Sequence, residues 1–351
     1  MLAAVLLLPC TAQAISARSA IVMDGQTGRV LYEKDADRRS LIASTTKIMT
    51  ALVVCEQCNV LDRMRIPKEA IGIEGSSMYL REGEVLTLQE LLYGLMLHSG
   101  NDAAVALAIY CGGTVEGFVE LMNDKARKLG LQSTHFANPN GLDHPDHYST
   151  ARDLAVLAAY AMENPIIAKT VSTKTVSCGN RYLRNHNKLL WRVAGADGVK
   201  TGYTKAAGRI LVSSAARDDR RLIAVTIHAP DDWNDHVSLL ENGFADYRVQ
   251  QFVQKGDILA TVSVIGGEES EVSLIGMEDF SYALADGETL TIRVPAPGFV
   301  YAPVVQGMDA GVVYVCLGEK TVGKIAVSYD RTVEQQKQKD ISFWERIFGE
   351  K

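Results

Sequence analysis

The chain has 351 residues, of which 47% are hydrophobic and 22% charged, and it carries a formal net charge of −6. This composition is typical of a globular protein with a sizeable core, and the length is sufficient for two domains. The acidic balance argues against general nucleic-acid binding, which needs an excess of basic side chains to neutralise phosphates. The composition and charge do not exclude polar or cationic substrates.

The N-terminus has the features of a secretory signal sequence. Residues 2–8 are apolar, Pro9 interrupts them, and Ala12-Gln13-Ala14 is a small-x-small cleavage site. We therefore expect residues 1–14 to be a signal peptide and the mature protein to be extracytoplasmic. The alternative is a buried N-terminal strand, although the run from Arg18 to Val22 is the better candidate for a first strand. No later segment reaches the ~20 apolar residues of a membrane span.

Helices and strands are interleaved between residues 15 and 248. Two apolar runs, 21–23 and 29–32, flank a turn with two glycines and predict a hairpin. The apolar patterns that follow predict helices over residues 44–54, 86–97, 103–110, 115–129 and 151–162. Strands are then expected over residues 174–177, 199–203, 209–216 and 221–228, followed by a helix over 235–246. This order predicts an α+β domain with a helical insert.

The pattern changes after residue 248. Residues 249–330 contain short β-type runs separated by Gly or Pro turns, which predicts a small all-β domain. Residues 331–351 form a tail that is polar at first. At ~100° per residue, the apolar side chains of its last part fall on one side of a helix: Ile341, Phe343, Trp344, Ile347 and Phe348. Such an amphipathic helix either lies in a membrane interface or docks on a protein surface.

Six cysteines are present, and Cys10 lies within the expected signal peptide. The remaining odd number excludes a complete disulfide framework. Cys55-x-x-Cys58 resembles half of a zinc or redox site, but no second pair follows it. Cys55 lies in an apolar run, so we expect it to pack in the core.

Ser44 and Lys47 place a hydroxyl and an amine three residues apart at the start of a predicted helix. Side chains at this spacing share one helix face. A serine hydroxyl becomes a good nucleophile when a base takes its proton, and a buried neutral lysine can be that base. The pattern alone is common in helices, so its meaning depends on other residues.

Two further motifs supply the groups that such a serine needs. Ser99-Gly100-Asn101 lies between two predicted helices, where the hydroxyl can relay a proton and the amide can orient a lysine and a substrate carbonyl. Lys200-Thr201-Gly202 lies on a predicted strand, where the ammonium and hydroxyl can bind a substrate carboxylate and the glycine allows a close backbone approach. Each tripeptide is common by itself; the alternatives are a helix cap and a surface strand.

Together, the three motifs resemble the S-x-x-K, S-x-N and K-T-G set of penicillin-recognising serine enzymes. Further segments resemble the low-molecular-mass penicillin-binding proteins, serine-type D-alanyl-D-alanine carboxypeptidases of peptidase family S11. They include Gly75-Ser76-Ser77-Met78, Asn138-Pro139-Asn140-Gly141-Leu142 and Gly198 to Thr204. The resemblance covers residues 18–247 and implies a transpeptidase-like domain, with an antiparallel sheet flanked by helices and a helical subdomain. The β-rich domain and tail match that family more loosely.

The resemblance implies a role for each motif residue. Ser44 would be acylated by a peptidoglycan stem peptide that ends in D-Ala-D-Ala, and β-lactam antibiotics would acylate it as inhibitors. Lys47 would be the base, Ser99 would pass the proton on, and Asn101 would orient Lys47 and the substrate. The remaining substrate-binding residues would be Lys200, Thr201, Gly202 and Thr204. The backbone N–H groups of Ser44 and Tyr203 would stabilise the oxyanion. No metal or cofactor is expected.

Several alternatives remain open from the residues. A Ser-His-Asp hydrolase is disfavoured because no serine lies in a G-x-S-x-G motif. A metal site at His144-x-x-His147 is disfavoured because a Pro-containing loop carries it and no clear third protein ligand is present. A class A β-lactamase needs a glutamate for deacylation, and Glu163 lacks the rest of that signature. A non-catalytic peptidoglycan-binding scaffold is disfavoured by the intact motifs.

Overall fold

A computed structural model describes residues 14–218, 220–295 and 298–337 of the chain. The chain divides into two compact units, with the boundary between Asp246 and Tyr247, close to the predicted boundary after residue 248. Each unit is described by itself. The predicted signal peptide falls on residues that, apart from Ala14, lie outside the described part.

A five-stranded sheet lies at the centre of the first unit. Its strands are β1 (Ser19–Asp24), β2 (Val30–Lys34), β7 (Ala196–Thr204), β8 (Gly208–Arg217) and β9 (Arg220–Ile227). They lie in the order β2-β1-β9-β8-β7, and all neighbours pair antiparallel. In this sheet β7 is therefore an edge strand, with unpaired backbone groups along its outer side.

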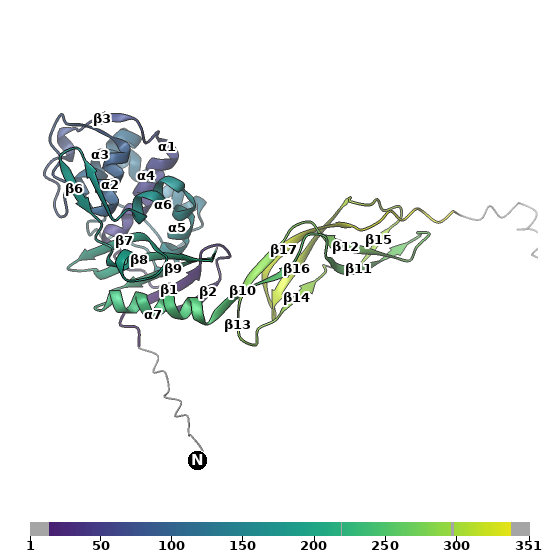
Figure 1. Cartoon of the computed structure of the whole chain (residues 1–351). Coiled ribbons are helices and arrows are strands. Elements are labelled where there is room, and N and C mark those ends of the chain that lie inside the picture. The colour runs from purple at the N-terminus through teal and green to yellow at the C-terminus, as the bar shows by residue number, and fades with distance from the viewer. Residues whose placement is uncertain (1–13, 219, 296–297, 338–351) are drawn as a thin grey trace, which may run out of the picture. The chain divides into compact units, whose positions relative to one another are not determined.

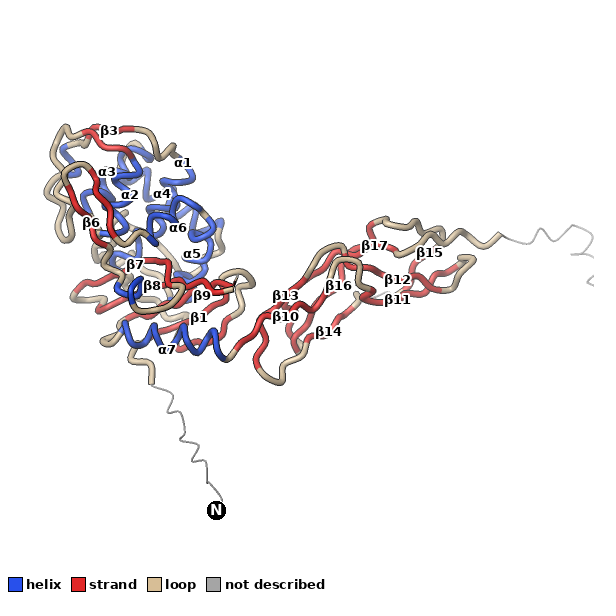
Figure 2. Tube along the Cα trace, in the orientation of Figure 1, coloured by secondary structure: helices blue, strands red, loops and turns tan. Residues whose placement is uncertain are grey.

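The helical part of the first unit lies on one side of this sheet (Figure 2). Its helices are α1 (Lys47–Gln57), α2 (Leu88–Leu97), α3 (Asn101–Gly112), α4 (Val115–Lys128), α5 (Ala151–Glu163) and α6 (Pro165–Ser172). Short hairpins accompany them: β3 (Arg63–Arg65) with β4 (Val85–Thr87), and β5 (Thr175–Cys178) with β6 (Arg181–Arg184). No single described helix is long and apolar enough to cross a membrane; the sharply bent pair α3 and α4 meets that test only jointly.

The sheet is the middle layer of the first unit because its side chains alternate between two faces. On β8, Ile210 and Val212 belong to the hydrophobic cluster of helices α1 to α6. Leu211 lies between them in sequence and packs instead with Leu240 of α7. Helix α7 spans Asp232–Ala245 and runs along the opposite face of the sheet (Figure 1).

Local signals explain where the elements differ from the predicted ones. The helix predicted over 86–97 begins at Leu88, because Thr87 and Glu90 form a reciprocal capping box and Val85–Thr87 pairs with β3. Helix α6 was not predicted; its signal is Asn164 as N-cap followed by Pro165 in the first turn. The helix predicted from Ser44 begins as a 3-10 turn over Ala43–Thr46, and α1 follows it.

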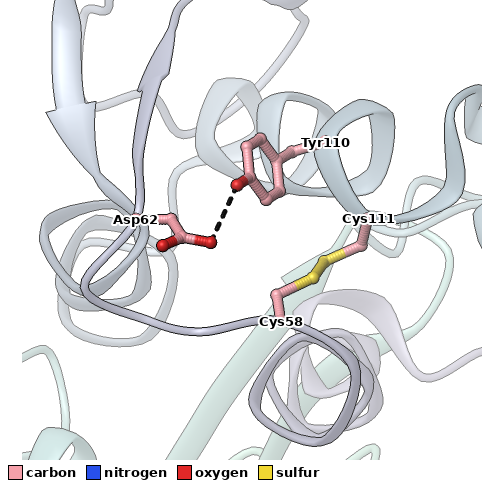
Figure 3. Close-up of a disulfide and its surroundings, with 4 residues drawn as sticks. All are labelled: Cys58, Asp62, Tyr110 and Cys111. Atoms are coloured by element: carbon pink, nitrogen blue, oxygen red, sulfur yellow. Dashed lines mark hydrogen bonds between the residues drawn. A yellow bond between two sulfur atoms is a disulfide. The ribbon is translucent and has the colours of Figure 1, made fainter.

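A disulfide joins Cys58, at the end of α1, to Cys111 in the last turn of α3 (Figure 3). Their Cα atoms are 6.5 Å apart, and a hydrogen bond of 3.1 Å from Tyr110 to Asp62 lies beside them. Cys55 remains a free thiol that packs against the core. The Cys55-x-x-Cys58 pattern is therefore one core thiol and one half of a long-range disulfide.

The second unit is made of strands. β10 (Tyr247–Val253) pairs with β13 (Phe280–Ala285). The larger sheet contains β11 (Ile258–Ile265), β12 (Glu271–Gly276), β14 (Leu290–Arg293), β15 (Phe299–Tyr301), β16 (Asp309–Leu317) and β17 (Lys320–Tyr329). Its order is β14-β16-β17-β12-β11-β15. The predicted fold class, an α+β domain followed by a small all-β domain, is confirmed.

The β-rich unit extends beyond residue 330, where the tail was predicted to begin. Val333 is buried in its core and bridges to Val304, and Gln335 bridges to Gly267. The amphipathic helix predicted over residues 341–348 lies outside the described residues.

Candidate active site

Ser44 and Lys47 lie together where the 3-10 turn meets α1. Lys47 Nζ is 2.9 Å from Ser44 Oγ, and the lysine is completely buried. Burial holds the pKa of Lys47 well below its ordinary value; the charge of Lys200 lowers it further, while Asp102 opposes the shift. A neutral amine beside a serine hydroxyl can take its proton, which is the chemistry that the spacing predicted.

Two carbonyl oxygens orient this amine. Lys47 Nζ donates to Asn101 Oδ1 at 2.7 Å and to the Asn140 carbonyl at 2.5 Å. A neutral amine has two N–H bonds and one lone pair. When both hydrogens point to these oxygens, the lone pair is left facing Ser44 Oγ. Asn140 was not predicted as a site residue, because a backbone carbonyl has no side-chain signature in the sequence.

The turn that carries Ser44 is held in an uncommon conformation. Ala43 has φ +45°, and its carbonyl accepts a hydrogen bond of 2.8 Å from Thr46 Oγ1. Gly141 packs against the same carbonyl: a Cβ at Gly141 would lie 2.0 Å from Ala43 O, and its φ is +88°. Only glycine fits there, and it allows the loop from Asn138 to Leu142 to pack directly against the 3-10 turn that carries Ser44, the nucleophile turn.

His147 supports the same turn from within the core. Its Nε2 lies 2.7 Å from Thr46 Oγ1, and its Nδ1 accepts from the Ala137 N–H at 3.1 Å. Burial lowers the pKa of His147 to about 4. Both ring nitrogens are thus engaged inside the protein. In the described part of the chain, no three His, Cys, Asp or Glu side chains are grouped to hold a metal ion.

The turn between α2 and α3 brings the second motif to the site. Ser99 has φ +63° and lines the same pocket as Ser44. Asn101 is the first residue of α3, and its Nδ2 donates to the Glu74 carbonyl at 2.5 Å, while its Oδ1 accepts from Lys47. Asp102 then fixes the neighbouring loop through three hydrogen bonds, from Ser77 Oγ and from the Met78 and Leu80 N–H groups.

The third motif lies on the edge strand β7, next to the nucleophile turn. A Cβ at Gly202 would lie 3.2 Å from the Ile42 carbonyl, so glycine permits the close packing. Lys200 is buried, its Nζ donates to the Thr201 carbonyl at 2.9 Å, and burial lowers its pKa to about 7. Thr204 Oγ1 donates to Asp143 at 2.9 Å.

A pocket of about 320 Å³ opens over Ser44. Five predicted residues line it: Ser44, Ser99, Thr201, Gly202 and Tyr203. Lys47, Asn101, Lys200 and Thr204 do not contribute to its lining. The residues that sequence reasoning missed are Ser76, His186, Lys188, Arg209, Ile210, Asp232 and Trp233. One of these residues, Arg209, could have been found from the sequence, because pairing the two predicted strands as a hairpin places it opposite Tyr203.

Comparison with known proteins agrees with this geometry. Residues 9–231 match the family model of peptidase S11, described as D-alanyl-D-alanine carboxypeptidase. The chain belongs to this family. Residues 247–335 match the model of the C-terminal domain of penicillin-binding protein 5, which corresponds to the β-rich unit. The S11 assignment made from the three motifs is thereby confirmed.

Similar members of the S11 family span nearly the whole chain. The D-alanyl-D-alanine carboxypeptidase DacF of Bacillus subtilis is 32% identical, and the match covers 95% of this chain and 90% of that protein. DacC of Escherichia coli is 33% identical, with 92% and 86% covered. The solved structure of penicillin-binding protein 5 from Haemophilus influenzae has a TM-score of 0.79 at 31% identity, and the match covers 92% of this chain and 98% of that one.

Proposed function

We propose that this chain is a serine-type D-alanyl-D-alanine carboxypeptidase that removes the terminal D-alanine from peptidoglycan stem peptides through an acyl-enzyme on Ser44. It is also a penicillin-binding protein, because a β-lactam offers a strained amide and a carboxylate like the end of that peptide. The observation that carries the proposal is the contact of 2.9 Å between Ser44 Oγ and the buried amine of Lys47.

In the acylation step, Lys47 takes the Ser44 proton while Oγ bonds to the carbonyl carbon of the penultimate D-alanine. The C–N bond to the last D-alanine breaks, and Ser99 passes a proton to the leaving amine. Water then attacks the Ser44 ester, which releases the shortened peptide and restores the hydroxyl. Asn101 holds Lys47 in place through the hydrogen bond of 2.7 Å.

Charge that develops on the carbonyl oxygen needs hydrogen-bond donors. We assign these to the backbone N–H groups of Ser44 and Tyr203, and removing one donor of this kind from an enzyme typically costs about 3–4 kcal/mol of transition-state stabilisation. Tyr203 lies on the edge strand β7 beside the pocket, where alternate backbone groups are unpaired. Lys200 and Thr201, with Gly202 and Thr204, complete the proposed substrate-binding strand.

We also propose that the protein acts outside the cytoplasmic membrane. The signal-like residues 1–14, the peptidoglycan substrate and the Cys58–Cys111 disulfide support this location, because disulfides persist in oxidising compartments. The amphipathic pattern of residues 341–348 supports peripheral attachment to a membrane surface.

Ser44→Ala tests the proposed function. The wild type should release D-alanine from a peptide ending in Lys-D-Ala-D-Ala and gain the mass of one penicillin by intact-protein mass spectrometry. The variant should form no adduct and lose at least about 10⁴-fold in D-alanine release, because no other group can form the acyl-enzyme. An equal adduct on the variant would refute Ser44 as the nucleophile. Peptide binding without release by the wild type would instead favour a scaffold.

A further inference from the structure

One segment of the first unit differs in charge from the rest of the chain. Residues 164–196 contain no aspartate or glutamate, although the whole chain carries a net charge of −6. The basic residues of this segment are Lys169, Lys174, Arg181, Arg184, Lys188 and Arg192. Within the described part of the chain, Arg181 alone among them pairs with a carboxylate, that of Glu84. The others are exposed to solvent without such a partner.

The fold gathers three of these cations around one exposed tryptophan. Lys174 Nζ and Arg184 Cζ lie 5.6 and 5.3 Å from the centre of the Trp191 ring. Lys188 and Trp191 are the first and last residues of a 3-10 turn, in which side chains three residues apart leave the same side. The ring is nonetheless 45% exposed. A flat aromatic surface is therefore presented to solvent among cations.

The β5–β6 hairpin extends this surface. Tyr182 and Arg184 are two residues apart on β6, so their side chains stand on the same face of the hairpin. Leu183 between them is buried in the core of the helical part, and Tyr182 is 70% exposed on the other side. A single face thus combines two aromatic rings and three cations, and we call it the aromatic–basic face. Its members are Lys174, Tyr182, Arg184, Lys188 and Trp191.

The aromatic–basic face begins at the pocket over Ser44. Lys188 Nζ lies 5.9 Å from the centre of the Trp233 ring, and both residues line that pocket. The other four members of the face do not contribute to the pocket lining. A ligand that occupies the pocket and this face together must therefore be larger than the peptide end that reacts with Ser44.

The chemistry of the face fits a polymer that carries both sugars and carboxylates. An exposed aromatic ring can stack on the apolar side of a sugar ring, and lysine and arginine form charge-assisted hydrogen bonds with carboxylates. Peptidoglycan supplies sugar rings along its glycan strand and free carboxylates on its stem peptides. An anionic lipid surface would use the cations alone and would leave both exposed rings without a role.

We propose that the aromatic–basic face binds polymeric peptidoglycan beside the pocket, so that the enzyme prefers stem peptides attached to a glycan strand over free peptides. This inference rests on the proposed function, since it names the form of the substrate that the same pocket receives. It assigns to β6 and the 3-10 turn over Lys188–Trp191 a part of substrate recognition that the three motifs do not contain.

Two forms of one substrate test this proposal. The first is a soluble, un-cross-linked glycan strand that carries pentapeptide stems, and the second is the free pentapeptide cut from the same strand. Release of D-alanine gives kcat/KM per stem for each form, and the ratio of strand to free peptide reports binding outside the pocket. The wild type should show a ratio above one, which should fall as added salt screens the cations.

Trp191→Ala should lower this ratio about 5- to 10-fold, because the stacking surface is lost. Trp191→Phe keeps a flat ring and should retain most of the ratio. Lys174→Gln combined with Arg184→Gln should lower the ratio about 3- to 10-fold at low salt. None of these three residues lines the pocket, so kcat/KM for the free pentapeptide should stay at the wild-type value.

Arg63→Gln combined with Lys68→Gln is the matched control. It removes the same two charges from exposed positions of the first unit that are outside both the pocket and the face. Its ratio should equal that of the wild type. A ratio that falls as far in this control as in the Lys174 and Arg184 variant would mean that net charge, and not the face, attracts the polymer.

Co-sedimentation with insoluble peptidoglycan measures the same binding without catalysis. The Ser44→Ala protein should pellet with it, and adding Trp191→Ala should reduce the pelleted fraction. If the proposed function fails, the wild type releases D-alanine from neither form of the substrate, and co-sedimentation still tests the face. If Trp191→Ala does not fold, the Lys174 and Arg184 variant decides.

Three results would overturn the proposal. One is an unchanged ratio in both Trp191→Ala and the Lys174 and Arg184 variant. Another is an equal loss with the strand and the free pentapeptide, which would mean a structural role. The third is reduced binding of these variants to phosphatidylglycerol vesicles with unchanged binding to peptidoglycan, which would make the face a lipid-binding surface.

Discussion

The two units of this chain bury different kinds of side chain. The first unit buries two lysines, Lys47 and Lys200, together with several carboxylates, two histidines and several asparagines. In the described part of the second unit, the buried polar side chains other than tyrosine are Ser273 and Ser328. Burying a charge or an unpaired polar group costs folding free energy. The difference therefore separates a unit whose interior performs chemistry from one whose interior only packs.

Lys47→Met should produce the largest effect, a loss of acylation of Ser44 without a comparable loss of stability. Without the base, acylation of Ser44 should slow by about 10³-fold or more. The Tm should nevertheless stay within about 4 °C, because removing an amine that is costly to bury offsets the three lost hydrogen bonds, to Ser44, Asn101 and Asn140. Time courses of penicillin acylation give the acylation rate, and thermal unfolding gives the Tm. Lys255→Met, at an exposed position of the second unit, should change neither, and a large fall in Tm without loss of acylation would reverse the conclusion.

Lys200→Gln should change the pH dependence of acylation. Lys47 works as a base only when neutral, so the rate falls as the pH drops through its pKa. The Lys200 charge lowers that pKa; removing it should raise the pKa of Lys47 and move the acid limb of kcat/KM to higher pH. Lys205→Gln removes an exposed lysine just after β7 and should leave the limb in place. A limb that does not move would mean that the two amines are not coupled.

Acid should destabilise the first unit before the second. Burial lowers the pKa of His147 to about 4 and that of His236 to about 3, whereas an unfolded histidine titrates near 6.5. The unfolded chain therefore binds more protons below pH 6.5, and stability is lost as the pH falls from there toward 4 and 3. Each histidine removes up to about 1.4 kcal/mol per pH unit.

All seven histidines precede residue 247, so the second unit has none to protonate. Hydrogen exchange of the full chain at pH 7 and pH 5 should show faster opening of the first unit only, measured against the intrinsic exchange rate at each pH. Equal loss of protection in both units would contradict this prediction.

Much of the site was predictable because its motifs are local or have a fixed spacing. Ser44 and Lys47 are three residues apart, so one turn of helix is enough to bring them together. Ser99 lies in a short connection between two well-patterned helices, and Asn101 begins the second of them. The order of helices and strands also followed from apolar periodicity, which determined the fold class but not the ends of each element.

The remaining site residues come from contacts that no local pattern encodes. Asn140 reaches Lys47 across 93 residues and acts through its backbone carbonyl. Asp232 was placed outside the predicted closing helix, yet it lies at the first turn of α7 and holds Arg209 of β8. Such pairs depend on the register of a hairpin and on how a helix packs across a sheet. The Cys58–Cys111 pair was missed for the same reason, because its partners are 53 residues apart.

That disulfide has a consequence for the unfolded chain. Lys47 begins α1 and Asn101 begins α3, while Cys58 and Cys111 join the far ends of these helices. Closing a loop of 53 residues removes conformational entropy from the unfolded state worth about 4 kcal/mol on the chain-entropy model. In a reducing compartment this contribution would be absent, so the two helices that supply the base and its orienting amide would be held together by packing and by the hydrogen bond between Lys47 and Asn101 until the thiols are oxidised.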